Sequence, residues 1–203
     1  LSVNRMVGIN RFIKSCEDKT LGLVIFLLII PLLCIIAFAL FVTSGRPIIF
    51  KQKRLGWDGR AFTIYKFRTM KPHKERENKI TQATIDDQRF TLIGKWLRKS
   101  SFDELPQIIN VLQGRMSLVG PRPHVAQHDN EYQKTIQGYV RRYSVKPGIT
   151  GWAQVNDLRG EIRSIDDINR RLQHDLFYIE NWSLWFDLRI ILTTIIKVFI
   201  SRQ

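Results

Sequence analysis

The stretch LGLVIFLLIIPLLCIIAFALFV, residues Leu21 to Val42, contains no charged side chain and is almost entirely apolar. A helix rises about 1.5 Å per residue, so a helix over this stretch would be roughly 33 Å long, enough to cross a bilayer. The stretch is too long for a signal peptide, and no small-residue cleavage site follows it. It therefore predicts a helix that is buried in a membrane.

Two features bear on whether this helix crosses the membrane. Pro31 lies near its middle, where it removes a backbone hydrogen bond and clashes with the preceding turn. Both flanks are basic, and the positive-inside rule places basic flanks in the cytoplasm. The upstream flank has Arg5, Arg11, Lys14 and Lys19 beside Glu17 and Asp18, and the downstream flank has Arg46, Lys51, Lys53 and Arg54. A helix broken at Pro31 that enters and leaves by one face fits both features, but prolines also occur in spanning helices, so both forms stay open.

The C-terminal residues 182–200 are a second apolar segment. Arg189, Thr193 and Lys197 are spaced by four and share one helix face, while most of the remaining residues are apolar or aromatic. This pattern is typical of an amphipathic helix lying in the membrane interface. A buried core helix fits the same pattern equally well.

The middle of the chain predicts one β-hairpin. Two strand-like segments, Ile48 to Lys53 and Ala61 to Phe67, flank the turn signal Gly56-Trp57-Asp58-Gly59. The polar segment Lys71 to Gln88 predicts a loop with little fixed structure.

Helical patterns follow this hairpin. Ser101 to Glu104 and Ser164 to Asp167 each resemble a helix capping box, and apolar residues at helical spacing follow both. Gly114 is placed to end the first of these helices. The expected fold is mainly α with a small β-hairpin, divided into a membrane anchor over residues 1–45 and a second domain over residues 46–203.

Composition narrows the class of protein. The 203 residues carry a net charge of +14, with 44% hydrophobic and 25% charged residues, so the chain should fold and should meet an anionic partner. Two cysteines and four scattered histidines give neither a disulfide framework nor a zinc spacing. No P-loop and no G-x-G-x-x-G fingerprint is present. The first residue is Leu1, which suggests a fragment of a longer chain.

Adjacent carboxylates lie beside several cations. Asp103 and Glu104 follow Arg98, and Arg122 lies in the stiff loop Gly120-Pro121-Arg122-Pro123. Carboxylates can hold Mg²⁺ or act as nucleophiles, and arginine offers a planar fork that matches phosphate. These are the groups that phosphoryl transfer needs. The same two carboxylates also fit a plain helix cap that complements the helix dipole.

Three strings resemble a known family in this order along the chain. They are YKFRTM (Tyr65 to Met70), RKSSFDELPQIINVLQGRMSLVGPRP (Arg98 to Pro123) and KPGITGWAQVN (Lys146 to Asn156). The chain resembles the bacterial sugar transferase, or monotopic phosphoglycosyl transferase, family from about Lys14 to its C-terminus. TQATIDDQR, WAQVNDLRGE and YIENWSLWFDLRI resemble, within it, the undecaprenyl-phosphate glucose phosphotransferases of the WcaJ type.

The resemblance implies roles for individual residues. Asp103 would be the nucleophile, and Asp103 with Glu104 would bind Mg²⁺ as the cofactor. The implied substrate-binding residues are Arg98, Arg122, Lys66, Arg159 and Asp175. The anchor would be a re-entrant helix, although the Ser-Pro pair that is frequent at its break is Ile30-Pro31 here.

The resemblance also implies substrates and a location. A hexose 1-phosphate, glucose 1-phosphate first among the candidates, would pass from a UDP-sugar to undecaprenyl phosphate, releasing UMP and initiating exopolysaccharide or capsule synthesis. The enzyme would contact membrane lipids at the cytoplasmic face of the bacterial inner membrane and would bind no nucleic acid. A transmembrane region would precede this chain in the longer protein. A homodimer is compatible with this picture. The alternative function is a basic module that binds the membrane surface without catalysis.

Overall fold

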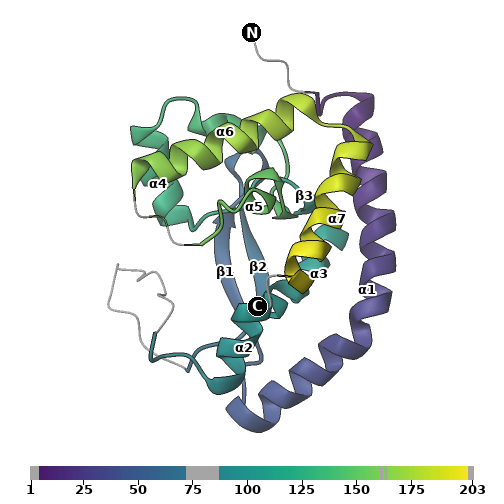
Figure 1. The fold of residues 1–203 in the computed structure, drawn as a ribbon, viewed down its shortest axis with the longest axis vertical. Coiled ribbons are helices and arrows are strands. Elements are labelled where there is room, and N and C mark those ends of the chain that lie inside the picture. Colours follow the sequence, from purple (N-terminus) through teal and green to yellow (C-terminus); the bar gives the residue numbers. More distant parts are fainter. Residues whose placement is uncertain (1–4, 72–86, 161, 163, 201–203) are drawn as a thin grey trace.

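The computed structural model describes residues 5–71, 87–160, 162 and 164–200 (Figure 1). Seven helices, three short 3-10 segments and four strands make up this part of the chain. In chain order they are α1 (Ile9–Ser44), β1 (Ile49–Leu55), η1 (Trp57–Gly59), β2 (Ala61–Phe67), α2 (Leu92–Ser100), η2 (Phe102–Gln107), α3 (Ile108–Leu112), β3 (Ser117–Val119), α4 (Ala126–Thr135), η3 (Tyr139–Ser144), β4 (Gly148–Thr150), α5 (Trp152–Val155), α6 (Ile165–Asn181) and α7 (Leu184–Ile200). The expected class, mainly helical with a small hairpin, is confirmed.

The N-terminal helix α1 is a single helix of 36 residues that contains Pro31. It is the one described helix long and apolar enough to cross a membrane. Figure 1 shows it bent, with its upper part along α7 and its lower part turned beneath the body. The expected break is therefore a bend inside a continuous helix, because a proline removes one hydrogen bond and one turn can absorb that loss.

Both halves of α1 attach to the same folded body. In the N-terminal half, Asp18 Oδ1 accepts hydrogen bonds from the Leu118 amide (3.0 Å) and the Ser117 hydroxyl (2.9 Å). Lys14 Nζ in the same half lies 2.7 Å from Asp187 of α7. In the C-terminal half, the buried Leu40 belongs to a cluster with Phe67 of β2 and Leu97 of α2.

The hairpin forms where it was predicted. β1 and β2 pair antiparallel from Ile49↔Phe67 to Leu55↔Ala61. Asp58 (φ 53°) and Gly59 (φ 67°) adopt the left-handed conformations that such a turn requires. The Asn110 side chain joins α3 to β2, since it accepts from the Tyr65 amide and donates to the Thr63 carbonyl.

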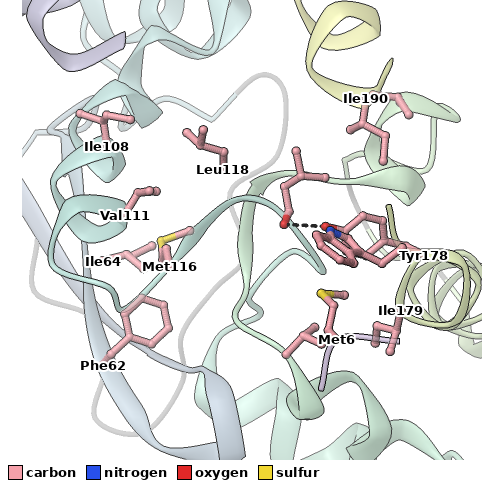
Figure 2. Close-up of a cluster of buried hydrophobic side chains, with 14 residues drawn as sticks. Met6, Phe62, Ile64, Ile108, Val111, Met116, Leu118, Tyr178, Ile179 and Ile190 are labelled. Carbon is pink, nitrogen blue, oxygen red and sulfur yellow. Dashed lines mark hydrogen bonds between the residues drawn. The ribbon is translucent and has the colours of Figure 1, made fainter. Parts of the chain in front are cut away.

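The core lies between this hairpin and the C-terminal helices. Buried Ile64, Val111, Met116, Leu118 and Tyr178 bring β2, α3, β3 and α6 together (Figure 2). The Tyr178 hydroxyl lies within hydrogen-bond distance of two acceptors, the Val119 carbonyl at 3.0 Å and Asp187 Oδ1 at 2.7 Å. The hydroxyl of this buried tyrosine is therefore satisfied, and it fixes β3 against α6.

A second, parallel strand pair was not predicted. β3 and β4 pair through Ser117↔Gly148 and Val119↔Thr150, so the Gly120 to Pro123 loop that follows β3 lies beside the Lys146 to Gly151 motif that contains β4. A Cβ on Gly148 would lie 2.1 Å from the Gly120 nitrogen. Only glycine permits this backbone contact, which explains the glycines of the two motifs.

The two expected capping boxes have different outcomes. Ser164 and Asp167 form the full box at the start of α6. Ser101 makes no such cap: it has φ 60°, ends α2, and passes directly into the 3-10 segment η2. The prediction at Ser101 was wrong because a capping residue needs an extended backbone and Ser101 is left-handed; the Glu104 side chain is also bound elsewhere, as described below.

The helix α7 is partly buried in the core and partly exposed. Ile190 is completely buried, whereas the Trp185 side chain is 76% exposed and Leu192 58% exposed. One apolar face therefore packs on the core and another is uncovered. The predicted loop from Lys71 to Gln88 falls mostly on residues 72–86, which lie outside the described residues.

Candidate active site

The Asp103 and Glu104 pair lies in a tight chain reversal. α2 ends at the left-handed Ser101, and the six-residue η2, which includes Pro106, starts at once. β2 packs against η2, which brings Lys66 toward the carboxylates. Asp103 is 8% and Glu104 9% exposed, so both charges lie largely out of water.

Glu104 is fully engaged by cations. Its Oε1 accepts from Lys66 Nζ at 2.8 Å, and Arg122 forms a two-pronged pair with Nη1 on Oε2 (3.0 Å) and Nη2 on Oε1. Burial alone would raise the pKa of Glu104, but Arg122 and Lys66 outweigh it and hold the pKa well below its usual range. Glu104 is therefore ionised at neutral pH.

Asp103 has different surroundings. Its carboxylate forms no hydrogen bond or ion pair with the residues that the structure describes. Burial and the adjacent Glu104 raise its pKa to about 6, against the opposing effects of Lys66, Arg98 and Arg122. The two neighbours thus divide into a fixed carboxylate and an unengaged one, which is the form a nucleophile needs.

Two more of the sequence-predicted residues lie beside this pair. Arg98 is in the last turn of α2, with its guanidinium 4.7 Å from the centre of the Phe90 ring and close enough to Asp103 to act on its charge. Arg159 donates from Nη2 to the Ser101 hydroxyl at 3.0 Å. The Arg122 side chain keeps 33% exposure. Three arginines therefore surround Asp103, where an anionic substrate could meet them.

Asp175 does not reach the carboxylate pair in this structure. It is buried in α6 and accepts from Arg142 Nη2 at 2.9 Å. The same Nη2 donates to the backbone carbonyl of Arg122 at 2.7 Å. Asp175 is therefore connected to the site through Arg142. Sequence reasoning did not identify Arg142. The adjacent arginines in RRYSVKPG differ in burial, which no local pattern reveals.

The donor set can be tested for a metal ion. The described residues contain no group of three His, Cys, Asp or Glu side chains. Mg²⁺ needs fewer protein ligands, because it keeps waters and shares substrate phosphate oxygens with one or two carboxylates. A carboxylate has about four acceptor positions. Glu104 uses three of its own and Asp103 uses none, so the pair fits Mg²⁺.

Comparison with known proteins places the chain in a family. The bacterial sugar transferase family model matches residues 9–201. The chain belongs to the bacterial sugar transferase family. Family membership agrees with the strings that surround Asp103, Arg122 and Gly148.

Several curated relatives are similar over most of the chain. A UDP-glucose:undecaprenyl-phosphate glucose-1-phosphate transferase of Escherichia coli (strain K12) is 49% identical over 96% of this chain and 42% of its own length. The protein of that name from Caulobacter vibrioides is 43% identical over 90% of this chain and 68% of its own. A UDP-N-acetylgalactosamine-undecaprenyl-phosphate N-acetylgalactosaminephosphotransferase of Aeromonas hydrophila is 40% identical over 91% of this chain and 43% of its own. The chain spans about two fifths of the length of the first of these relatives.

Proposed function

We propose that this chain is the catalytic part of a transferase that moves a hexose 1-phosphate from a UDP-sugar to undecaprenyl phosphate. The observation that carries the proposal is the unengaged, buried Asp103 carboxylate beside a Glu104 that two cations hold in place. The names of the relatives support the same reaction. A helix cap would need neither Lys66 nor Arg122 at this place.

In the first step, an Asp103 oxygen attacks the β-phosphorus of the UDP-sugar. A bond forms between this oxygen and phosphorus, and the bond from phosphorus to the bridging oxygen breaks, so UMP leaves. The sugar phosphate remains on Asp103 as an acyl phosphate. Arg122 and Arg98 are placed to offset the repulsion between an anionic carboxylate and an anionic phosphate.

In the second step, a phosphate oxygen of undecaprenyl phosphate attacks the same phosphorus. The bond to Asp103 breaks, the carboxylate is restored, and the polyprenyl diphosphate sugar leaves. Asp103 and Glu104 would hold Mg²⁺, which would neutralise phosphate charge when bound. Lys66 keeps Glu104 oriented, and Arg159 lies where it can contact the diphosphate.

We propose UDP-glucose or UDP-galactose as the donor. Relatives named for glucose support it, and so does a galactosyl transferase of Streptococcus agalactiae that is 42% identical over 89% of this chain. The relative named for N-acetylgalactosamine is the main competitor. The product would initiate exopolysaccharide or capsule synthesis.

The membrane topology belongs to the same proposal. Asp18 and Leu40, near opposite ends of α1, both contact the body that carries Asp103. Arg68 of this body also donates to the Gly45 carbonyl at the C-terminal end of α1 (3.0 Å). A helix that crossed the bilayer would separate these contacts, so we propose that α1 enters and leaves by one face, the cytoplasmic face of the inner membrane.

Release of UMP tests the reaction. The protein, in detergent with Mg²⁺ and undecaprenyl phosphate, should release UMP from UDP-glucose or UDP-galactose faster than from UDP-N-acetylgalactosamine. A preference for the acetamido sugar would overturn the donor assignment alone. A folded protein that binds anionic vesicles but releases no UMP from any of the three sugars would instead support the basic membrane-binding module.

A further inference from the structure

The loop that carries Arg122 is held by three successive backbone carbonyls. The Pro121 carbonyl accepts from the Gly148 amide of β4 (3.0 Å), and the Pro123 carbonyl accepts from Arg54 Nη1 of β1 (3.2 Å). Between them, the Arg122 carbonyl accepts from Arg142 Nη2 of η3 (2.7 Å). The residue that presents its guanidinium to Glu104 is therefore fixed at its backbone by a second arginine from another element.

Arg142 uses both ends of its guanidinium. Its Nη2 is shared between the Arg122 carbonyl and Asp175 Oδ2, and its Nη1 donates to the Tyr139 hydroxyl (2.6 Å) and to His124 Nδ1 (2.8 Å). Its side chain is 4% exposed. Lysine has one nitrogen on a flexible stem and cannot span both sets of partners.

The partners of Arg142 are themselves fixed. The Tyr139 hydroxyl donates to Asp129 Oδ1 at 2.5 Å, so Asp129 of α4 lies behind the tyrosine. His124 Nδ1 accepts a hydrogen bond from Arg142 Nη1. This histidine is neutral, because burial and the charge of Arg142 lower its pKa to about 3. This buried cluster therefore contains one cation, Arg142, and two carboxylates, Asp129 and Asp175. It joins α4, η3 and α6 behind the Arg122 loop.

We propose that Arg142 is a positioning residue for the reaction, acting through the backbone of Arg122. Arg142 makes no contact with Asp103 or Glu104. It fixes the backbone position from which the Arg122 side chain extends toward Glu104. Asp175 is its counterion, which gives this aspartate a role behind the site in place of a direct contact with substrate. The activity readout of this inference rests on the proposed function, whereas its backbone readout does not.

The test variant is Arg142→Lys, and Arg141→Lys is the matched control. Arg141 is the neighbouring residue, with a 46% exposed side chain paired to Glu180. Hydrogen–deuterium exchange is followed by mass spectrometry on peptides covering residues 117–125. We expect faster exchange in these peptides for Arg142→Lys and wild-type exchange for Arg141→Lys. Unchanged exchange in Arg142→Lys would overturn the inference whatever the activity.

Kinetics then connect the backbone to catalysis. Misplacement of Arg122 should lower kcat/KM for UMP release by about 10- to 100-fold, because small errors in position are costly in catalysis. In an Arg122→Ala background, Arg142→Lys should add less than about a further 2-fold, since both changes remove the same interaction. Fully additive losses would assign Arg142 to general folding, as would faster exchange throughout the chain.

A second variant covers a failure of Arg142→Lys to fold. Asp175→Asn keeps the arginine and its carbonyl contact but removes the counterion, and we expect a smaller increase in exchange confined to residues 117–125. Wild-type exchange there would overturn the inference. If wild-type protein releases no UMP from any UDP-sugar, the proposed function fails, and the exchange comparison still decides whether Arg142 holds the Arg122 loop.

Discussion

Two neighbouring carboxylates, those of Asp103 and Glu104, differ at the scale of single residues. Lys66 and Arg122 neutralise Glu104, while Asp103 has burial without a partner. The ionised form of Glu104 is therefore stabilised, and the ionised form of Asp103 is destabilised. An acyl-phosphate mechanism benefits from this division, since Glu104 is fixed by its cations while the Asp103 oxygens have no such partner and can form a bond to phosphorus.

The first prediction concerns Asp103→Asn. Wild-type protein incubated with labelled UDP-glucose and Mg²⁺, without lipid, should retain label on one aspartate. Asp103→Asn should retain none and should lose turnover, because an amide is a poor nucleophile. Asp58→Asn is the control, since Asp58 lies in the exposed hairpin turn where asparagine fits the left-handed backbone. Near-normal turnover by a folded Asp103→Asn protein would contradict the assignment.

The pH dependence of the same residue is a second prediction. In the protein without Mg²⁺, Asp103 should ionise with a pKa of about 6. Because burial raises the folded-state pKa of Asp103, the contribution of this residue to stability is greatest below pH 4 and falls as pH rises to about 6. Asp103→Asn escapes this loss, so at pH 8 it should be more stable than wild type by at most about 3 kcal/mol. Thermal unfolding at pH 4 and pH 8 checks this, and an equal difference at both pH values would contradict it.

The third prediction is that Glu104→Gln destabilises the protein. It leaves two largely buried cations without their anion, which should cost about 3–5 kcal/mol at pH 7. The pKa of Glu104 is depressed, so its contribution is present above about pH 4.5 and lost on acidification, and the gap to wild type should shrink there. Glu180→Gln, which breaks the exposed pair with Arg141, should cost under about 1 kcal/mol in the same unfolding experiment. Equal, small losses in the two variants would show that the Glu104 pairs contribute little.

The sequence motifs identified the residues that line this site, but they did not identify the buried residues that hold these side chains in position. Lys66, Arg98 and Arg122 lie in the quoted strings, and the fold brings them to Asp103 and Glu104. Arg142 could not be distinguished from Arg141, because burial of one member of an Arg-Arg pair depends on tertiary contacts with α6 and the Arg122 loop. Asp175 was selected, but its partner depends on the same contacts.

At the scale of elements, local signals succeeded where they were strong. The hairpin has a turn with two left-handed residues and flanking strands of seven residues each, and it formed as expected. β3 and β4 have three residues each, too few for a periodic pattern, so only the structure reveals their pairing. Ser101 and Ser164 have similar local strings, yet only Ser164 caps a helix, because Ser101 has a left-handed backbone and Glu104 is held by tertiary ion pairs.

The fourth prediction concerns α1. Cys16 precedes the apolar stretch and is exposed, and Lys51 is exposed in β1 after it. In a Cys34→Ala background, Cys16 and the cysteine of Lys51→Cys should both react with a membrane-impermeant maleimide in inverted membrane vesicles. Neither should react in intact spheroplasts, and both should react in detergent as a control. Labelling of the two positions from opposite sides would establish a spanning helix.

At the scale of the whole molecule, either of two features could attach the protein to a membrane: its basic charge or the exposed apolar side chains of α1 and α7. The chain carries a net charge of +14, which attracts anionic lipid headgroups. It also exposes apolar side chains along α1, such as Leu28 (75%) and Phe38 (69%), and along α7, such as Trp185. Charge attraction is screened by salt, whereas apolar burial is not, so ionic strength separates the two contributions.

The last prediction is that membranes carrying this protein keep it during a wash with about 1 M NaCl, where the screening length is about 3 Å. Leu28→Asp should shift the protein toward the supernatant, because a charge in the middle of a membrane helix costs roughly 2.5–3.5 kcal/mol. Val140→Asp is the matched control: Val140 is an exposed apolar residue of η3, outside α1 and α7, and its substitution should leave the protein in the pellet. Immunoblots of pellet and supernatant before and after the wash measure both. Release of wild-type protein by salt alone would mean that the basic surface holds it, as the binding-module alternative requires, and that the apolar face of α1 is covered by something other than lipid.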